Sequence, residues 1–231
     1  MVDITVAICC YKQKKWLHRC LRSLANQTID PSCFEVVIVN DDPDPEFGLE
    51  EICDSMKAQL NIRLINNSKN LGLPESLNKI LNIMKGRFFV RVDSDDYVSE
   101  HFLYMLSCFL KMNENFQGVF CDYKKVDKVG RRIETCSAKE FPIACGVMYT
   151  YESLCEVGFY NENFKMREGH ELLKRYKQKY DLFHMNVPLY RYRIHEENRT
   201  KDKQRLKNYD SMLYNENENN KLNSQGIDNE K

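Results

Sequence analysis

The stretch RFFVRVDSDD, residues 87–96, decides the fold that we predict for this chain. Aromatic and β-branched residues in its first six positions are typical of a buried strand, and an acidic group follows at once. In a sheet of parallel strands covered by helices, ligands bind beyond the carboxyl ends of the strands. The stretch therefore predicts an α/β sheet with a ligand site at its edge.

Similar apolar runs alternate with helical patterns throughout residues 1–97. Apolar residues at three- and four-residue steps indicate helices at residues 17–24 and 73–84, and Pro74 fits the first turn of the second helix. Such alternation predicts a Rossmann-like, mostly parallel twisted sheet flanked by helices. The predicted strands of this half are residues 3–9, 34–39, 62–65 and 87–92.

Beyond residue 97 the pattern becomes mixed, and we expect the acceptor side of a cleft there. From Arg199 on, polar and charged residues dominate, which predicts a flexible tail at 199–231 with one transient helix near 201–213. Residues 1–198 are thus predicted to form one compact domain. Within its second half we predict helices at 99–111, 152–157 and 168–177, a strand or hairpin at 119–133, a less regular stretch at 141–148, and strands at 182–186 and 189–194.

Composition excludes several classes of protein. Lys and Arg together number 34, and Asp and Glu together also number 34, so the chain lacks the basic excess of a nucleic-acid binder. No apolar run approaches the roughly 18 residues of a membrane-spanning helix, and the N-terminus lacks the pattern of a secretory signal. The ten cysteines show no Cys-x-x-Cys pair. We therefore expect free thiols in a reducing cytoplasm rather than disulfides.

The acidic group at residues 93–96 is the sharpest candidate site. In extended backbone, side chains two residues apart point the same way, so Asp93 and Asp95 can face one ligand. Two convergent carboxylates suit a hard cation such as Mg²⁺ or Mn²⁺. The alternative is a solvated loop whose aspartates cap the following helix.

Two further polar groups follow the predicted sheet. Asp41 and Asp42 come directly after the strand at 34–39, where a carboxylate can accept the imide N–H of a uracil or thymine ring or a ribose hydroxyl. Asn70 and Gly72 precede a helix whose free N–H groups suit an anion or a nucleotide. The alternatives are a turn in the Asp-Pro-Asp-Pro run at 42–45 and an ordinary helix start.

Late in the chain, Glu168 and Glu171 are spaced to share one face of a helix. A carboxylate at a cleft wall can take the proton from an acceptor hydroxyl. The alternative is an ion-paired helix start. His195 follows the last predicted strand and can complete the coordination of a metal held by Asp95, unless it is simply a surface histidine.

Taken in order, these segments resemble the family 2 glycosyltransferases, whose fold is called GT-A. The resemblance runs from about Ile4 to Thr200. It rests on the family's opening strand, the helix ending in Ser-Leu-x-x-Gln-Thr, the acidic turn, Asn-x-Gly, the strand into Asp-x-Asp and the late acidic helix. These stand here at residues 6–12, 20–28, 40–42, 70–72, 93–96 and 167–172.

The resemblance implies a role for each motif. Asp41 or Asp42 would contact the nucleotide base, Asp93 the ribose or diphosphate, and Asp95 an Mn²⁺ or Mg²⁺ ion with His195 as a further ligand. Asp93 also joins the predicted metal ligands. The nucleotide site would be completed by Tyr11, Asn70, Gly72 and Ser94. Residues 1–97 would be the nucleotide-sugar-binding half and 98–198 the acceptor half.

Three segments depart from the family pattern. Cys9-Cys10-Tyr11-Lys12 replaces Pro-Thr-Tyr-Asn, and Pro43 follows the acidic pair in place of glycine. The family's catalytic carboxylate usually comes from a Glu-Asp pair, but here Glu168 is followed by Gly169. Either Glu168 takes over as the base, or Glu171 must serve, or the enzyme is slow or inactive.

The implied activity is metal-dependent transfer with inversion from a nucleotide sugar, most often a UDP-sugar, to a hydroxyl of a glycan or lipid-linked acceptor. Family members build surface polysaccharides or glycolipids at the cytoplasmic face of a membrane, which implies a cytoplasmic protein with peripheral membrane association. A non-catalytic relative that binds a nucleotide sugar or a partner is the alternative. Sugar-nucleotide nucleotidyltransferases are disfavoured, because residues 9–15 contain no glycine.

Overall fold

The computed structural model describes residues 2–213. Four parallel strands form the first half of one sheet, in the order β3-β2-β1-β4. Every residue of β2 is buried, as expected for a parallel strand covered on both faces. The four strands are β1 (Ile4–Cys10), β2 (Phe34–Asn40), β3 (Ile62–Asn66) and β4 (Phe88–Arg91), close to the predicted bounds.

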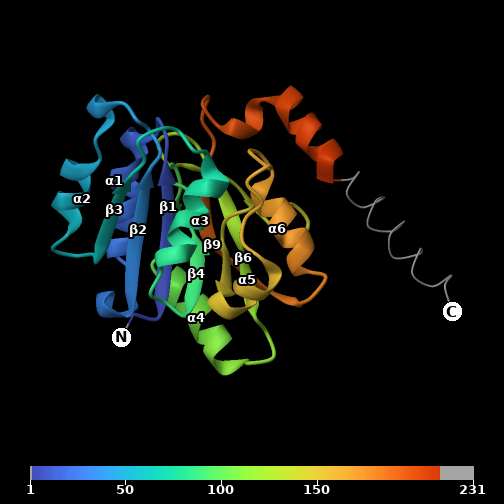
Figure 1. Cartoon of the computed structure of the whole chain (residues 1–231). Helices are drawn as coiled ribbons and strands as arrows, with labels where there is room; N and C mark the ends of the chain where they lie inside the picture. Colours follow the sequence, from blue (N-terminus) through green and yellow to red (C-terminus); the bar gives the residue numbers. More distant parts are fainter. Residues whose placement is uncertain (1, 214–231) are drawn as a thin grey trace, which may run out of the picture.

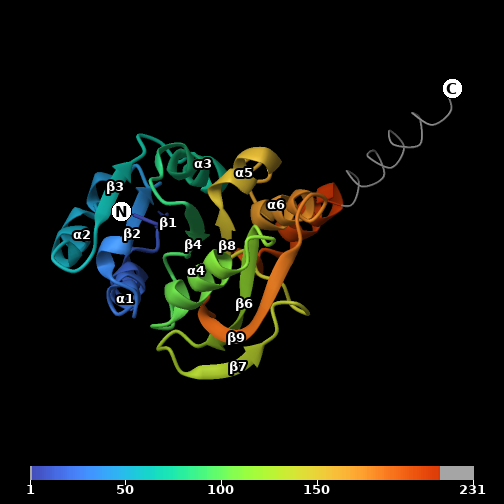
Figure 2. The ribbon, with the colours of Figure 1, turned by 90° about the horizontal axis from the view of Figure 1, so that it is seen from below.

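Helices cover both faces of this half, as predicted. α1 (Lys14–Ala25) and α2 (Glu50–Met56) pack on the face that carries Ile4 and Val6, whereas α3 (Leu73–Ile83) packs on the opposite face against Val37. Figure 2 shows the sheet between these layers. Helix α2 was not predicted from the sequence, because it is only seven residues long. Short 3-10 helices, η1 (Pro31–Cys33) and η2 (Pro45–Phe47), complete the connections.

The second half extends the same sheet with mixed pairing, in the order β4-β8-β6-β9-β5. β4 pairs antiparallel with β8, β8 antiparallel with β6, and β6 parallel with β9. The strands are β5 (Tyr97–Val98), β6 (Gly118–Val126), β7 (Arg132–Cys136), β8 (Val147–Thr150) and β9 (Leu182–Arg193). Against them pack α4 (Phe102–Met112), α5 (Tyr151–Val157) and α6 (Glu168–Tyr176).

Two predictions for this half were wrong in detail. The stretch at 141–148, predicted as irregular, ends in the buried strand β8. The two strands predicted at 182–186 and 189–194 are one strand, β9, which passes through Pro188. Proline cannot donate to a β-ladder, and the register of β6 against β9 shifts at Asp122, which faces Pro188. The proline therefore produces an irregularity instead of a break.

The segment after β9 is more ordered than the predicted tail. η3 (Arg199–Lys201) and a helical segment at residues 203–213 follow it. Arg167 donates two hydrogen bonds to Asp210, and the ring of Phe164 contacts that of Tyr209. Both views show the helical segment against α6 (Figures 1 and 2). These contacts offset the entropy of ordering a polar segment. The remainder of the predicted tail, 214–231, lies outside the described residues.

All ten cysteines are free thiols, and six of them are buried. Burial raises the pKa of Cys10 to about 11, so this thiol is protonated at neutral pH. Among residues 2–213, none of the helices combines the length and apolar character that a membrane crossing requires.

The start of β4 depends on a glycine. A Cβ at Gly86 would lie 2.5 Å from the backbone nitrogen of Thr5 and 2.6 Å from the carbonyl carbon of Ile4. We expect Gly86→Ala to lower the free energy of unfolding by about 2 kcal/mol or more, because β1 and β4 must separate to admit the methyl group. Urea unfolding measures the change.

Gly48→Ala is the matched control for this prediction. There the added Cβ would meet the mobile end of the Glu50 side chain, which can move away. An equal loss of stability in the two variants would show that backbone contact at Gly86 is not the cause.

Candidate functional site

The candidate site lies where β1, β2 and β4 end. Cys10 ends β1, Asp41 and Asp42 follow β2, and residues 93–96 follow β4. The segment after β9 passes over the same end of the sheet (Figure 1). Parallel strands end at the same edge, so groups distant in sequence meet there.

Asp95 and His195, which the sequence predicts as ligands of one metal ion, lie in direct contact. Asp95 Oδ2 is 2.8 Å from His195 Nε2. The Glu197 backbone N–H donates to His195 Nδ1, so His195 carries its proton on Nε2 and donates it to Asp95. The ring of Trp16, the only tryptophan, lies 5.6 Å from that of His195 and fixes its plane.

These two side chains fit a divalent cation. Adjacent ligands of an octahedral Mg²⁺, each about 2.1 Å from the ion, are about 3 Å apart, close to the observed separation. The Asp95 carboxylate is 19% exposed and can be reached by a ligand. Carboxylate and imidazole suit Mn²⁺ as well as Mg²⁺. Binding requires the proton on Nε2 to leave.

Asp93 has its carboxylate held by the protein. Arg91 Nε lies 2.6 Å from Asp93 Oδ1 and Nη2 lies 3.0 Å from Oδ2, while Cys145 Sγ donates to Oδ2. Burial raises the pKa of Asp93, but the charge and hydrogen bonds of Arg91 outweigh it, and the pKa lies below its usual value. Asp93 is thus ionised but has both oxygens hydrogen-bonded by protein donors, whereas the only hydrogen bond of the Asp95 carboxylate among the described residues is to His195.

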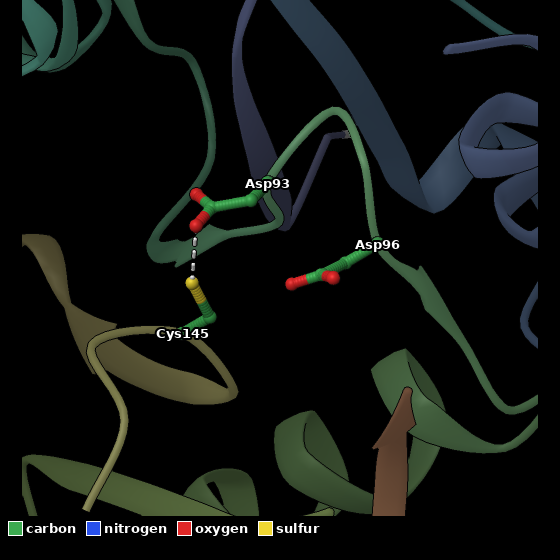
Figure 3. A group of neighbouring side chains, drawn as sticks. All are labelled: Asp93, Asp96 and Cys145. Atoms are coloured by element: carbon green, nitrogen blue, oxygen red, sulfur yellow. Dashed lines mark hydrogen bonds between the residues drawn. The ribbon is translucent and has the colours of Figure 1, made fainter. Parts of the chain in front are cut away.

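Asp93, Asp96 and Cys145 form a second cluster, drawn in Figure 3, whose ligand atoms lie within 4.8 Å of one another. Tyr190 and the Arg193 backbone N–H donate to the two oxygens of Asp96. Burial, and then Asp95 and Asp93, raise the pKa of Asp96 well above its usual value. Both oxygens of Asp96 already accept hydrogen bonds and the Cys145 thiol is buried, so neither is a good ligand for a hard cation and the cluster suits a structural role.

The two acidic residues after β2 have different surroundings. Both oxygens of Asp41 accept hydrogen bonds, from the backbone N–H groups of Leu71 and Gly72 and from Asn67. Asp41 thereby fixes the loop before α3, where Gly72 has a φ of 90°. Asp42 accepts a hydrogen bond from the Asp44 backbone within the predicted turn.

The other predicted nucleotide-binding residues lie around the same edge. Asn70 donates to the Asp41 carbonyl, Ser94 is buried in the loop after β4, and Tyr11 is exposed just past β1. The structure therefore brings together the segments that the sequence analysis chose. It adds Asn67 and Cys145, which no local pattern marked because each acts through a partner distant in sequence.

Of the two candidate bases, Glu168 is joined to the site. Its Oε1 accepts a hydrogen bond from Arg91 Nη1 at 2.8 Å. Both oxygens of Glu171 are held by Arg175, which also donates to backbone carbonyls after α5. Of the two, only Glu168 is bonded to a residue of the candidate site, whereas Glu171 is ion-paired within its own helix. Arg91 was not among the predicted site residues, because its position in an apolar strand indicated only packing.

Position 169 has no room for a side chain. A Cβ at Gly169 would lie 2.4 Å from Ala144 Cβ and 3.2 Å from Ala144 Cα. The loop before β8 therefore packs directly on the first turn of α6, and an aspartate at this position would require that loop to move.

Comparison with known proteins gives consistent results. The family model described as glycosyl transferase family 2 matches residues 5–160. A poly(ribitol-phosphate) beta-glucosyltransferase of Bacillus spizizenii is 31% identical over 115 residues, which are 49% of this chain and 18% of that protein. The chain spans about a third or less of the length of two curated relatives that it matches.

Solved structures share the fold. Staphylococcus aureus TarS 1–349 in complex with UDP-GlcNAc aligns with a TM-score of 0.75 and 20% identity, covering 87% of this chain and 61% of that chain. The mannosyltransferase PcManGT of Pyrobaculum calidifontis, in complex with GDP-Man and Mn²⁺, aligns with a TM-score of 0.68 and 15% identity, covering 88% and 60%. The predicted GT-A fold is thereby confirmed.

The raised pKa of Asp96 predicts a pH-dependent stability. Above pH 4 the unfolded state loses the Asp96 proton while the folded state keeps it, so the folded state binds more protons and stability falls as pH rises. Wild type should lose stability relative to Asp96→Asn as pH rises above 4, with a slope of at most about 1.4 kcal/mol per pH unit. Urea unfolding across this range measures the slope.

Asp127→Asn is the control for this measurement. Asp127 is a partly buried carboxylate in a turn, and hydrogen bonds from backbone N–H groups lower its pKa in spite of some desolvation, so its replacement should leave the slope above pH 4 unchanged. Identical slopes for wild type and Asp96→Asn would contradict the assignment of a protonated Asp96.

Proposed function

The chain belongs to glycosyl transferase family 2, and we propose that it transfers a sugar from a nucleoside diphosphate, a UDP-sugar, to a hydroxyl of a glycan or lipid-linked acceptor. The observation that carries the proposal is the contact of Asp95 with His195 at the edge of the sheet. The complexes of TarS with UDP-GlcNAc and of PcManGT with GDP-Man support a nucleotide-sugar donor. The name of the Bacillus relative supports a role in surface polysaccharide synthesis.

In this proposal Asp95 and His195 hold Mn²⁺ or Mg²⁺, and the Mn²⁺ in PcManGT supports a metal. When bound, the ion supplies positive charge for the diphosphate. Asp42 is the better candidate for contact with the nucleotide base, because both oxygens of Asp41 already accept hydrogen bonds from the loop before α3. Residues 1–97 would bind the donor and residues 98–198 the acceptor.

The reaction is proposed to be a single displacement with inversion. The acceptor oxygen attacks the anomeric carbon while the bond from that carbon to the diphosphate oxygen breaks, and the nucleoside diphosphate leaves with the bonding electrons. Glu168 takes the hydroxyl proton. Arg91 holds one oxygen of Glu168, and the other oxygen is the proton acceptor.

A second candidate function is nucleotide-sugar binding without turnover. It is favoured by the ion pair of Arg91 with Glu168. It is also favoured by the packing of Ala144 against Gly169, which leaves no room there for the aspartate of the family's Glu-Asp pair. If Glu168 only neutralises the buried Arg91, its role is structural and not catalytic. The two functions differ in whether replacement of Glu168 removes transfer or only stability.

The donor site predicts metal-dependent nucleotide binding. Calorimetric titration of UDP should show binding with Mn²⁺ that weakens at least about tenfold without it, because the cation neutralises the diphosphate. Asp95→Ala should bind UDP equally weakly with or without Mn²⁺. The emission of Trp16 should change on binding in wild type, since its ring contacts His195.

Asp54→Ala, which removes an exposed ion pair with Lys57, is the control and should bind UDP as wild type does. Binding of UDP to Asp95→Ala with unchanged metal dependence would refute the assigned metal site. Failure to bind either UDP or GDP, with and without metal, would refute the proposed function.

The assigned base predicts a loss of rate without a loss of donor binding. Glu168→Gln keeps the shape and one acceptor oxygen for Arg91 but cannot take a proton, so transfer should fall by a factor of about 100 or more. Calorimetry should show UDP affinity within about threefold of wild type, and the rate of sugar transfer measures the loss.

Glu171→Gln is the matched control, and we expect it to lower stability while keeping most of the activity, because Arg175 holds both oxygens of Glu171. Equal transfer rates in wild type and Glu168→Gln would remove Glu168 from the mechanism. Donor binding with no turnover in wild type would favour the non-catalytic function.

A further inference from the structure

A cavity of about 530 Å³ lies between α6, the helical segment at 203–213 and the loop at 140–142. One wall is polar, with Arg167, His170 and Lys174 from α6 and its N-cap, and Asp210 opposite them. The rim carries Phe141, whose side chain is 63% exposed. The cavity belongs to the half of the sheet that we expect to bind the acceptor.

The basic side chains of this cavity already have partners. Arg167 donates from Nε and Nη2 to the two carboxylate oxygens of Asp210, at 2.7 and 3.2 Å. Lys174 Nζ donates to the Leu213 carbonyl oxygen at 2.7 Å. Burial, and then the charge of Arg167, lower the pKa of His170, which is therefore neutral at pH 7. An anionic ligand would compete with the Asp210 carboxylate for Arg167, whereas a hydroxyl can donate to the Asp210 oxygens while this ion pair stays intact.

The four charged side chains that line the cavity also balance. Arg167 and Lys174 are cationic, and Glu140 and Asp210 are anionic. A lining of equal and opposite charges favours a neutral ligand that carries many hydroxyl groups, because hydroxyls can both donate to carboxylates and accept from a guanidinium.

The exposed ring of Phe141 adds a surface for the apolar face of such a ligand. An aromatic ring at the mouth of a cavity with convergent polar groups is a common arrangement in ligand sites. The Tyr123 hydroxyl donates to the Phe141 carbonyl oxygen and holds this part of the loop in place. Saccharides combine an apolar C–H face with a rim of hydroxyls, and they match both features.

The backbone places this cavity beside the candidate base. Arg167 has a left-handed conformation with φ of 63°, which is costly for a residue other than glycine or asparagine. With this turn, Arg167 reaches Asp210 in the cavity, while the next residue, Glu168, reaches Arg91 at the edge of the sheet. Two successive residues thus connect the cavity to the reaction site.

We propose that this cavity binds a neutral saccharide unit of the acceptor, with Phe141 against its apolar face and Arg167, Asp210 and Glu140 bonded to its hydroxyls. The inference rests on the proposed function, because it delivers an acceptor hydroxyl to Glu168. It deepens that function by naming the chemical class of the acceptor.

The test follows His170 by NMR, since the chain has only five histidines and His170→Gln assigns its imidazole signal. The probes are methyl β-D-glucopyranoside, methyl N-acetyl-β-D-glucosaminide and inorganic phosphate. At least one of the saccharides should shift the His170 signal at millimolar concentration, and phosphate should not. Phe141→Ala should weaken that saccharide roughly tenfold, as expected for the loss of a stacked ring.

Tyr104→Ala is the matched control, because Tyr104 is an aromatic residue on α4 that is 50% exposed and does not line the cavity. It should bind the saccharide as wild type does. UDP binding should be unchanged in Phe141→Ala, which separates this test from that of the donor site.

Three outcomes would overturn the proposal. No shift of His170 with either saccharide, while UDP still binds, would refute the cavity as an acceptor site and leave the proposed function intact. Equal saccharide affinity in wild type and Phe141→Ala would refute the role of the ring. A shift of the His170 signal with phosphate and none with the saccharides would refute a neutral ligand and show that the cavity binds anions.

Discussion

The candidate site depends on one buried cation, Arg91 at the end of β4. Its guanidinium is 6% exposed and donates to both oxygens of Asp93 and to Glu168. A buried charge is very costly unless it is paired and hydrogen-bonded, so these carboxylates are required wherever Arg91 is buried. Arg91 therefore connects the loop after β4 with the first turn of α6, which lies 77 residues further along the chain.

The acidic residues around this cation divide into two kinds. Asp41, Asp93 and Asp96 are satisfied by protein donors and hold the loops of the site in position. Asp95 contacts only His195 through its carboxylate among the described residues, and it remains partly exposed. A rigid set of paired carboxylates thus surrounds one that can accept a ligand, and this preorganisation is what a metal or nucleotide site requires.

The second half of the sheet supplies what the first half lacks. β9 pairs in parallel with β6 and ends beside the loop after β4, so that Arg193 and His195 reach Asp95 and Asp96. The chain then continues through η3 to the helical segment at 203–213, which bonds to Arg167 just before Glu168. One continuous segment consequently contacts both the candidate metal ligands and the start of the helix that carries the candidate base.

The sequence by itself determined the fold and the edge of the sheet where the site lies. The periods of apolar residues, two in strands and 3.6 in helices, are local properties of the sequence. Acidic residues that follow buried strands mark the ligand edge of a parallel sheet, so Asp41, Asp95 and the start of α3 could be located. That His195 would share a metal ion with Asp95 was an expectation from the resemblance to the family.

Only the tertiary structure decided which of these side chains are available. Arg91 bonds to Glu168, and Cys145 bonds to Asp93, across more than 50 positions of the chain. Arg91 also bonds to Asp93 two positions away. The packing of a loop places Ala144 against Gly169. The cavity beside α6 likewise exists because residues 203–213 return to the domain. Local sequence patterns set the direction of a side chain, but its partner is chosen by the folded chain as a whole.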